Sequence, residues 1–163
     1  MPKFEFSCFY TSFKSLARKT IAMDNPISQQ EHNQAVLRYQ WGHLVFLVAE
    51  DIEMNYLFLS EALKKTGVHL LWAVNGQQAV EIFSSTPKID MVISDIQMPE
   101  KDGFAATREI TALRPEVPII GYTAYSYDGV REKMILAGAK ECLIKPFEPK
   151  KLLLVIRKYL FQS

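Results

Sequence analysis

The sequence predicts an α/β fold in which an open, parallel β-sheet is covered by helices on both faces. Two observations support this fold class. From His43 onward, short apolar runs alternate with amphipathic stretches five times, and parallel neighbouring strands need such long, right-handed crossovers. The run Val45–Val48 contains no polar residue, as expected for a strand that is buried on both faces of a parallel sheet.

The chain divides into an extension and one domain. Its 163 residues suit a single core plus additional sequence. Residues 1–41 show no sustained periodicity and include a polar stretch at 25–34, so we expect 1–41 to be a linker or N-terminal extension that is poorly ordered. Residues 42–163 form the expected folded domain.

Composition excludes several classes of protein. Hydrophobic residues make up 48% of the chain and charged residues 23%, the usage of a soluble globular protein. A net charge of +1 gives no electrostatic argument for binding nucleic acid or an acidic membrane, and no apolar run approaches the ~20 residues of a membrane span. Cys8 and Cys142 belong to no Cys-x-x-Cys pair, so no zinc site or disulfide framework is predicted. We expect a cytoplasmic domain without a membrane segment and without direct nucleic-acid binding.

Each predicted strand is a short apolar run, and amphipathic segments follow each one. The predicted strands are Leu44–Ala49, His69–Val74, Met91–Ser94, Ile119–Tyr122 and Glu141–Ile144. Asn75 with Gln78 three residues later resembles a capping box at a helix start. Gly138 supplies a left-handed stop for the fourth helix, and Pro149 suits the first turn of the last one.

Carboxylates follow two central strands. Glu50 and Asp51 come directly after the first strand, and Asp95 comes directly after the third. Because the site of an open parallel sheet lies at the carboxyl ends of its strands, these groups would repel one another unless a divalent cation lay among them. Mg²⁺ fits best, since it prefers hard oxygen ligands and keeps water and phosphate oxygens as further ligands. The plainer alternative is that each acidic residue only caps the helix that follows.

The fourth and fifth strands lead into a hydroxyl and an ammonium group. Thr123 follows the fourth strand and Lys145 follows the fifth. The lysine offers a point charge to a phosphate oxygen. The threonine hydroxyl is a hydrogen-bond donor that can move toward the negative charge of the phosphate once the phosphate has arrived. Taken alone, Thr123 could be a turn residue and Lys145 a solvated charge. Together with three carboxylates they favour a phosphate site.

Four motifs carry a family resemblance. They are Ala49-Glu50-Asp51, Ser94–Pro99 with Asp102-Gly103, Tyr122-Thr123-Ala124 and Ile144–Phe147. In order and spacing they resemble the receiver domains of two-component response regulators, over most of residues 42–163. The resemblance implies a flavodoxin-like, doubly wound (βα)5 fold whose five-stranded parallel sheet has the order 2-1-3-4-5.

The resemblance also implies a phosphoryl-transfer role. Asp95 is the expected phosphoacceptor, and the donor is a phosphohistidine on a histidine kinase or a histidine phosphotransfer domain. Lys145 is expected to pair with Asp95 or with the phosphoryl group, and Thr123 to move toward the phosphate and report its arrival. Such a domain catalyses its own phosphorylation and slow autodephosphorylation rather than the turnover of a small molecule.

The same resemblance implies a set of magnesium ligands. Asp51 and Asp95 are expected to bind Mg²⁺ directly and Glu50 to help through water. The backbone carbonyl of Gln97 would complete the protein ligands.

The sequence departs from the family at one switch position. Receivers usually carry Tyr or Phe three residues before the conserved lysine, an aromatic that rotates inward when the threonine moves, and here that position is Cys142. A thiol cannot reproduce that change of rotamer. We therefore predict that the output face couples to phosphorylation differently, through Tyr125 or Phe147. The alternative is that the nearby tyrosines only pack or form hydrogen bonds at the surface.

The flanking sequence indicates a larger protein. Val48–Asn55 and the segment after Lys140 resemble receivers at the C-terminus of hybrid sensor histidine kinases, and Arg38–Trp41 is similar to the linkers before them. We expect the chain to be part of such a kinase, itself anchored in a membrane in some cases; a freestanding regulator is the alternative. His32 lacks the pattern of a phosphorylated kinase histidine and is interpreted as solvated. The sequence leaves open whether phosphorylation drives homodimerisation.

A haloacid-dehalogenase-like phosphatase is the alternative from another class. Such enzymes also use an aspartyl nucleophile and Mg²⁺, but they need a second acid two residues beyond the nucleophile. Gln97 occupies that position after Asp95. Without this proton donor we do not expect turnover of external phosphate esters.

Overall fold

The computed structural model describes residues 40–124 and 128–161. Residues 1–39, which make up nearly all of the expected extension, and Tyr125 lie outside the described residues. The compact unit that contains the described residues begins at Gln40. The reason is Trp41, which is only 1% exposed and packs on Phe46 with ring centroids 6.1 Å apart.

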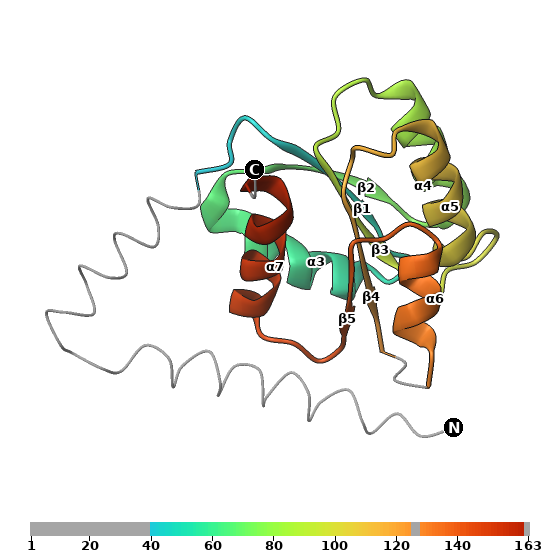
Figure 1. The fold of residues 1–163 in the computed structure, drawn as a ribbon. Coiled ribbons are helices and arrows are strands. Elements are labelled where there is room, and N and C mark those ends of the chain that lie inside the picture. Colours follow the sequence, from blue (N-terminus) through green and yellow to red (C-terminus); the bar gives the residue numbers. More distant parts are fainter. Residues whose placement is uncertain (1–39, 125–127, 162–163) are drawn as a thin grey trace, which may run out of the picture. The chain divides into compact units, whose positions relative to one another are not determined.

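Strands and helices alternate along the described chain (Figure 1). The elements are β1 (Val45–Ala49), α3 (Glu53–Leu63), η1 (Lys64–Thr66), β2 (His69–Ala73), α4 (Gly76–Ser85), β3 (Met91–Asp95), α5 (Gly103–Leu113), β4 (Ile119–Thr123), α6 (Val130–Leu136), β5 (Glu141–Ile144) and α7 (Pro149–Phe161). Each strand ends within one residue of its predicted bounds. None of the helices in this part of the chain combines the length and the apolar character that crossing a membrane requires.

The five strands form one parallel sheet with the order β2-β1-β3-β4-β5, which confirms the predicted fold. β1 pairs with β2 on one side and with β3 on the other, so that Ala49 lies opposite both Ala73 and Ser94. The direction of winding reverses between β1 and β3. Ligands of such sheets bind in the crevice outside the carboxyl ends of the strands at this reversal.

Helices cover both faces of the sheet (Figure 1). α3 and α7 lie on one face, called here the α3–α7 face, and α4, α5 and α6 lie on the other, the α4–α6 face. A buried cluster on the α4–α6 face joins strand residues such as Leu47 to Phe83 of α4 and Ile110 of α5. Alternate strand side chains, such as Phe46 and Ile120, are fully buried and point to the α3–α7 face. Burying each such side chain contributes roughly 1.5–3 kcal/mol.

Side chains cap the helices that begin near the site. The Asn75 side chain accepts a hydrogen bond from the Gln78 backbone N–H at 2.7 Å, as the predicted capping box requires. The return bond is shifted by one residue, because Gln78 Oε1 accepts from the Val74 N–H. Asp102 caps α5 in the same way, accepting from the Ala105 N–H at 2.7 Å. These caps fix where the helices start relative to the strand ends.

Gly138 follows α6 with a φ of +116°, a left-handed backbone that glycine adopts without strain. A Cβ at this position would also meet Thr111 Oγ1 at 2.3 Å. The predicted helix stop is therefore present, and close packing against α5 requires it as well.

Candidate functional site

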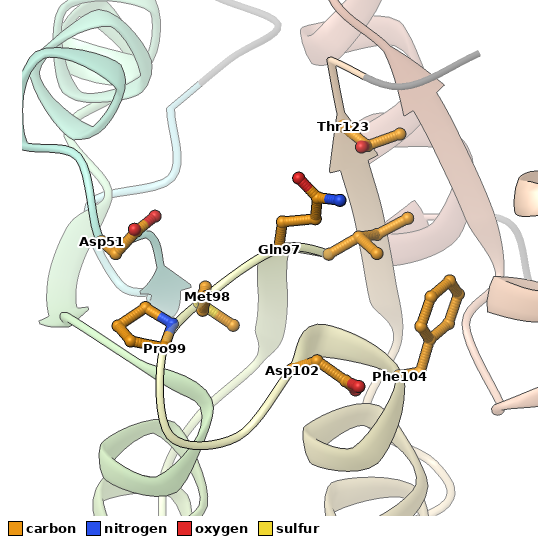
Figure 2. Close-up of a pocket in the computed structure, with 8 residues that line it drawn as sticks. Asp51, Gln97, Met98, Pro99, Asp102, Phe104 and Thr123 are labelled. Carbon is orange, nitrogen blue, oxygen red and sulfur yellow. The ribbon is translucent and has the colours of Figure 1, made fainter. Parts of the chain in front are cut away.

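A cleft lies at the carboxyl edge of the sheet, where β1, β3 and β4 end (Figure 2). Its volume is about 540 Å³, and it is lined by Asp51, Ile96, Gln97, Met98, Pro99, Asp102, Phe104 and Thr123. Three of the residues expected at the site, Asp51, Gln97 and Thr123, thus line one open hollow. Asp95 lies at the end of β3, one residue before Ile96, and is 6% exposed.

Three carboxylates converge beside this cleft. Glu50, Asp51 and Asp95 each offer one oxygen, and these oxygens lie within 4.8 Å of one another. The Asp51 side chain is exposed, but the part of it that is buried raises the pKa of the carboxyl group above its usual value. The negative charge of Glu50 raises this pKa further. The donor set consists of hard oxygens with an open side, which suits Mg²⁺. The three residues predicted from the sequence are therefore brought together with a spacing that a divalent cation can bridge.

Asp95 combines burial with two defined hydrogen-bond partners. Its Oδ1 accepts from the backbone N–H of Ile96 at 2.7 Å, and its Oδ2 lies 3.4 Å from Lys145 Nζ. Burial raises the pKa of Asp95 to about 6, although the Lys145 charge opposes this rise. A bound cation would favour the ionised, nucleophilic form.

Lys145 lies between two acids. Its Nζ is 3.2 Å from Glu50 Oε2 and 3.4 Å from Asp95 Oδ2, and it also lies 4.1 Å from the centre of the Tyr122 ring. The ammonium group therefore offsets part of the repulsion between the buried carboxylates. Its side chain is 20% exposed, so the charge can still reach a ligand in the cleft.

Glu50 is fully buried and accepts four hydrogen bonds. Its Oε1 accepts from the Ile52 backbone N–H and from Asn55 Nδ2, each at 3.0 Å. Its Oε2 accepts from Lys145 Nζ and from the hydroxyl of Tyr122. A buried carboxylate needs such compensation, because an unpaired charge in the interior costs several kcal/mol.

The loop after β3 places the start of α5 directly against Asp95. The Gly103 N–H donates to the carbonyl of Ile96 at 2.8 Å. A Cβ on Gly103 would lie 2.0 Å from the backbone oxygen of Asp95, so only glycine permits this approach. The Asp102-Gly103 motif thus holds α5 against the strand that carries Asp95.

Residues 46–157 match the response regulator receiver domain family. The chain belongs to that family. It is 33% identical over 113 residues to the chemotaxis protein CheY of Thermotoga maritima, covering 69% of this chain and 93% of that protein. It is 35% identical over 108 residues to hybrid signal transduction histidine kinase H of Dictyostelium discoideum, covering 63% of this chain but only 8% of that kinase.

A solved receiver-domain structure supports membership of this family. The receiver domain of a Pseudomonas aeruginosa sensor histidine kinase, which holds a magnesium ion coordinated in its active-site cleft, matches with a TM-score of 0.67 and 30% identity. The match covers 73% of this chain and 98% of that one. The protein is therefore a CheY-like receiver domain of a two-component system, with the flavodoxin-like strand order predicted for it.

Cys142, the residue at the usual aromatic switch position, lies away from the cleft of this receiver. It is 4% exposed on β5, opposite Gly121 of β4, and belongs to the buried cluster of the α4–α6 face together with Met134. Burial raises the pKa of its thiol to about 11. A small apolar side chain therefore fills the place where family members carry an aromatic ring.

Tyr122 is the site residue that sequence reasoning missed. The sequence assigns it no role of its own beside Thr123, yet it is 1% exposed and its hydroxyl donates to Glu50. Burial, and then the charge of Glu50, raise its pKa strongly, so the hydroxyl keeps its proton. The available signal was a tyrosine inside a fully buried strand, since such a hydroxyl needs a partner.

Proposed function

We propose that this receiver accepts a phosphoryl group on Asp95 from a phosphohistidine of a histidine kinase or a histidine phosphotransfer domain, with Mg²⁺ as cofactor. The observation that carries the proposal is the arrangement around Asp95. A buried carboxylate at the edge of an open cleft has two further carboxylates and one ammonium group beside it. Catalysis in such a site consists of positioning and electrostatic stabilisation.

The residues fit a magnesium ion by their chemistry. Asp51 and Asp95 would bind it directly, Glu50 through water, and Gln97 through its backbone carbonyl. When bound, Mg²⁺ would offset the repulsion between the acceptor carboxylate and the incoming phosphoryl oxygens. The spacing of the three acids and the place of Gln97 in the lining of the cleft support this assignment.

The transfer exchanges one bond to phosphorus for another. An oxygen of Asp95 forms the new P–O bond while the P–N bond to the donor histidine breaks, and the electron pair of that bond returns to the imidazole ring. Lys145 Nζ lies 3.4 Å from Asp95 Oδ2, so its ammonium group can pair with the negative charge of the phosphoryl group that Asp95 receives. The Thr123 hydroxyl lines the cleft and can approach a phosphoryl oxygen. With Gln97 at the position of a phosphatase acid, we expect only slow hydrolysis of the phosphoaspartate.

We further propose that the signal leaves the site through Phe147 rather than through the position of Cys142. Phe147 packs edge-on against Tyr122, with centroids 6.4 Å apart, and against Phe58 of α3 at 5.8 Å. Amide exchange with and without beryllofluoride and Mg²⁺ tests this route. We expect changed protection in α3 and at the start of α7, and unchanged protection there would contradict it.

We propose a hybrid sensor histidine kinase as the parent protein, with a freestanding regulator as the alternative. Relatives of both kinds match, and the hybrid kinases are far longer than this chain. An antibody raised against residues 40–161 can decide by immunoblot of cells that express the native gene. A polypeptide several times larger than 18.7 kDa supports the hybrid kinase, and one of that mass supports the freestanding regulator.

Incubation with acetyl phosphate and Mg²⁺, followed by intact mass, tests the phosphoacceptor. We expect one phosphoryl adduct on the parent protein and none on Asp95→Asn. Asp102→Asn is the matched control, because Asp102 is an exposed carboxylate that lines the same cleft and asparagine caps helices equally well. Equal labelling of Asp95→Asn and the parent would refute the proposal.

A further inference from the structure

We propose that Tyr122 is a positioning residue that sets the magnesium affinity of the site, because its hydroxyl occupies an acceptor position on Glu50 that metal binding must recover. This inference rests on the proposed function, since it concerns the same metal site. In this role, the hydrogen bond from Tyr122 holds the Glu50 side chain in place and at the same time lowers the affinity of the site for Mg²⁺.

The count of acceptor positions on Glu50 carries the proposal. A carboxylate has about four lone-pair positions. Ile52 N–H and Asn55 Nδ2 occupy two of them on Oε1, while Lys145 Nζ and the Tyr122 hydroxyl take up Oε2. Because Glu50 is 0% exposed, bulk water has no access to it. A metal-bound water can therefore reach Glu50 only when one of these donors gives up its bond.

Tyr122 is the donor whose role is to be tested, because it has a fixed position and no charge. Its ring is buried between Lys145, at 4.1 Å from the ring centre, and Phe147, which meets it at an interplanar angle of 81°. The ring cannot swing away without disturbing both contacts, so the hydroxyl stays beside Glu50. Lys145, in contrast, is charged and contacts both Glu50 and Asp95, so replacing it would change the net charge beside two of the acids at once.

The Tyr122 hydroxyl also stabilises the negative charge of Glu50, which would otherwise be available to attract a cation. A hydrogen bond to an ionised group is stronger than one between neutral groups. Without the Tyr122 hydroxyl, the Glu50 carboxylate can accept a stronger hydrogen bond from a metal-bound water, while the net charge of the site stays the same. A phenylalanine at position 122 keeps the ring contacts and removes the competing donor.

Magnesium titration of Tyr122→Phe, followed by tryptophan fluorescence, tests this inference. The Trp72 indole donates to the backbone oxygen of Glu50 at 2.8 Å and can report on the site. We expect the dissociation constant for Mg²⁺ to fall by at least about threefold, as loss of a competing charged hydrogen bond implies. An unchanged or weaker affinity would overturn the proposal.

Tyr159→Phe is the matched control for the removal of a hydroxyl. Tyr159 also bonds a glutamate, with its oxygen 3.4 Å from Glu141 Oε2, and it donates to the Lys140 carbonyl at 2.8 Å. It lies on α7 and does not line the cleft. We expect its Mg²⁺ affinity to equal that of the parent, and a matching gain in this control would overturn the proposal.

A second measurement uses the unsubstituted protein and so does not depend on how the variant folds. In proton NMR spectra without metal, we expect a downfield resonance from the Tyr122 hydroxyl, identified by its absence in Tyr122→Phe or by selective tyrosine labelling. We expect this resonance to shift or broaden as Mg²⁺ saturates the site. A resonance that stays unchanged at saturation would overturn the proposal.

Asp51→Asn separates failure of this inference from failure of the proposed function. If Mg²⁺ binding does not weaken in Asp51→Asn, the proposed metal site is wrong, and the inference about Tyr122 falls with it. If binding depends on Asp51 while Tyr122→Phe binds like the parent, the metal site stands and only the inference about Tyr122 is contradicted.

Discussion

The two faces of the sheet meet the site with different side chains. On the α3–α7 face, Tyr122, Lys145 and Phe147 form a continuous set of contacts from Glu50 to α3. On the α4–α6 face, the corresponding place holds Cys142, with Gly121 opposite it on β4. An aromatic ring is therefore absent where relatives usually carry one and present on the opposite face. In this chain, side-chain contacts therefore run from the carboxylate cluster through Tyr122 and Phe147 to α3.

The largest effect is expected from removing the cation of the α3–α7 face. In Lys145→Ala, Glu50 and Asp95 lose the ammonium group that lies within 3.4 Å of both. Breaking a buried ion pair costs about 3–5 kcal/mol, and partial exposure of Lys145 reduces this to about 2–3 kcal/mol. Urea unfolding without metal measures the loss.

Lys101→Ala is the control for Lys145→Ala. Lys101 pairs with Glu109 at 2.7 Å, and its side chain is about as exposed as that of Lys145, but Glu109 is 48% exposed. A pair with such a solvated acid contributes at most about 1 kcal/mol. Equal losses in the two variants would contradict the importance of the ammonium group at the site.

Removing the charge of Asp95 is expected to stabilise the metal-free protein. The folded-state pKa of Asp95, about 6, lies above its ordinary value of 3.8, so the folded protein prefers the protonated acid. Stability linked to Asp95 is therefore fully present below pH 3.8 and is lost as the pH rises through 6. We expect Asp95→Asn to be more stable than the parent by on the order of 1–3 kcal/mol at neutral pH.

The advantage of Asp95→Asn should shrink as the pH falls and vanish below the ordinary pKa of the acid. Urea unfolding in the presence of a chelator, across this range, measures it. Asp102→Asn serves as the control, with no pH-dependent gain expected from an exposed carboxylate. An Asp95→Asn variant that is less stable than the parent at neutral pH would contradict the assigned pKa shift.

A smaller effect is expected from Phe147→Leu. Leucine keeps most of the apolar volume but loses the edge-on contacts with Tyr122 and Phe58, which are worth about 0.5–1.5 kcal/mol beyond burial. Thermal unfolding measures the loss. If the α3–α7 face carries the signal, the beryllofluoride-induced change in amide exchange of α3 should also shrink in this variant. A full response would contradict a signal route through Phe147.

The smallest effect concerns the thiol on the other face. Because burial raises the pKa of Cys142 to about 11 from 9.0, the stability linked to this thiol is present below pH 9.0 and is lost as the pH rises toward 11. In a Cys8→Ser background, we expect native Cys142 to react with iodoacetamide far more slowly at pH 8.5 than the unfolded chain does. Equal rates would show that the thiol is accessible and would remove the contrast between the two faces.

The strand ends explain why much of the site was predictable. Glu50, Asp95 and Lys145 lie at or next to the ends of apolar runs, so knowing where each run stops is enough to place all three at the same edge. Tyr122 was not predictable in this way. Its hydroxyl reaches Glu50 from β4 to the end of β1, across β3, so the contact depends on strand order and register together.

Trp41 shows the same limit at the start of the domain. It stands before the first apolar run, in a stretch without sustained periodicity that the sequence pattern assigns to the linker. Its burial depends on Phe46 and Phe161, whose rings each lie 6.1 Å away. Phe161 is far along the chain, so this contact exists only in the folded protein.

Chemical mapping of the phosphorylated residue shows most directly whether Asp95 is the phosphoacceptor. After incubation with acetyl phosphate and Mg²⁺, borohydride reduction converts a phosphoaspartate to homoserine, and fragmentation of the tryptic peptide Ile89–Lys101 locates the change. We predict homoserine at Asp95 and unmodified aspartate at Asp90 in the same peptide. Homoserine at Asp51, or reduction at neither residue of this peptide while the protein still carries a phosphoryl group, would contradict the assignment of Asp95 as the phosphoacceptor.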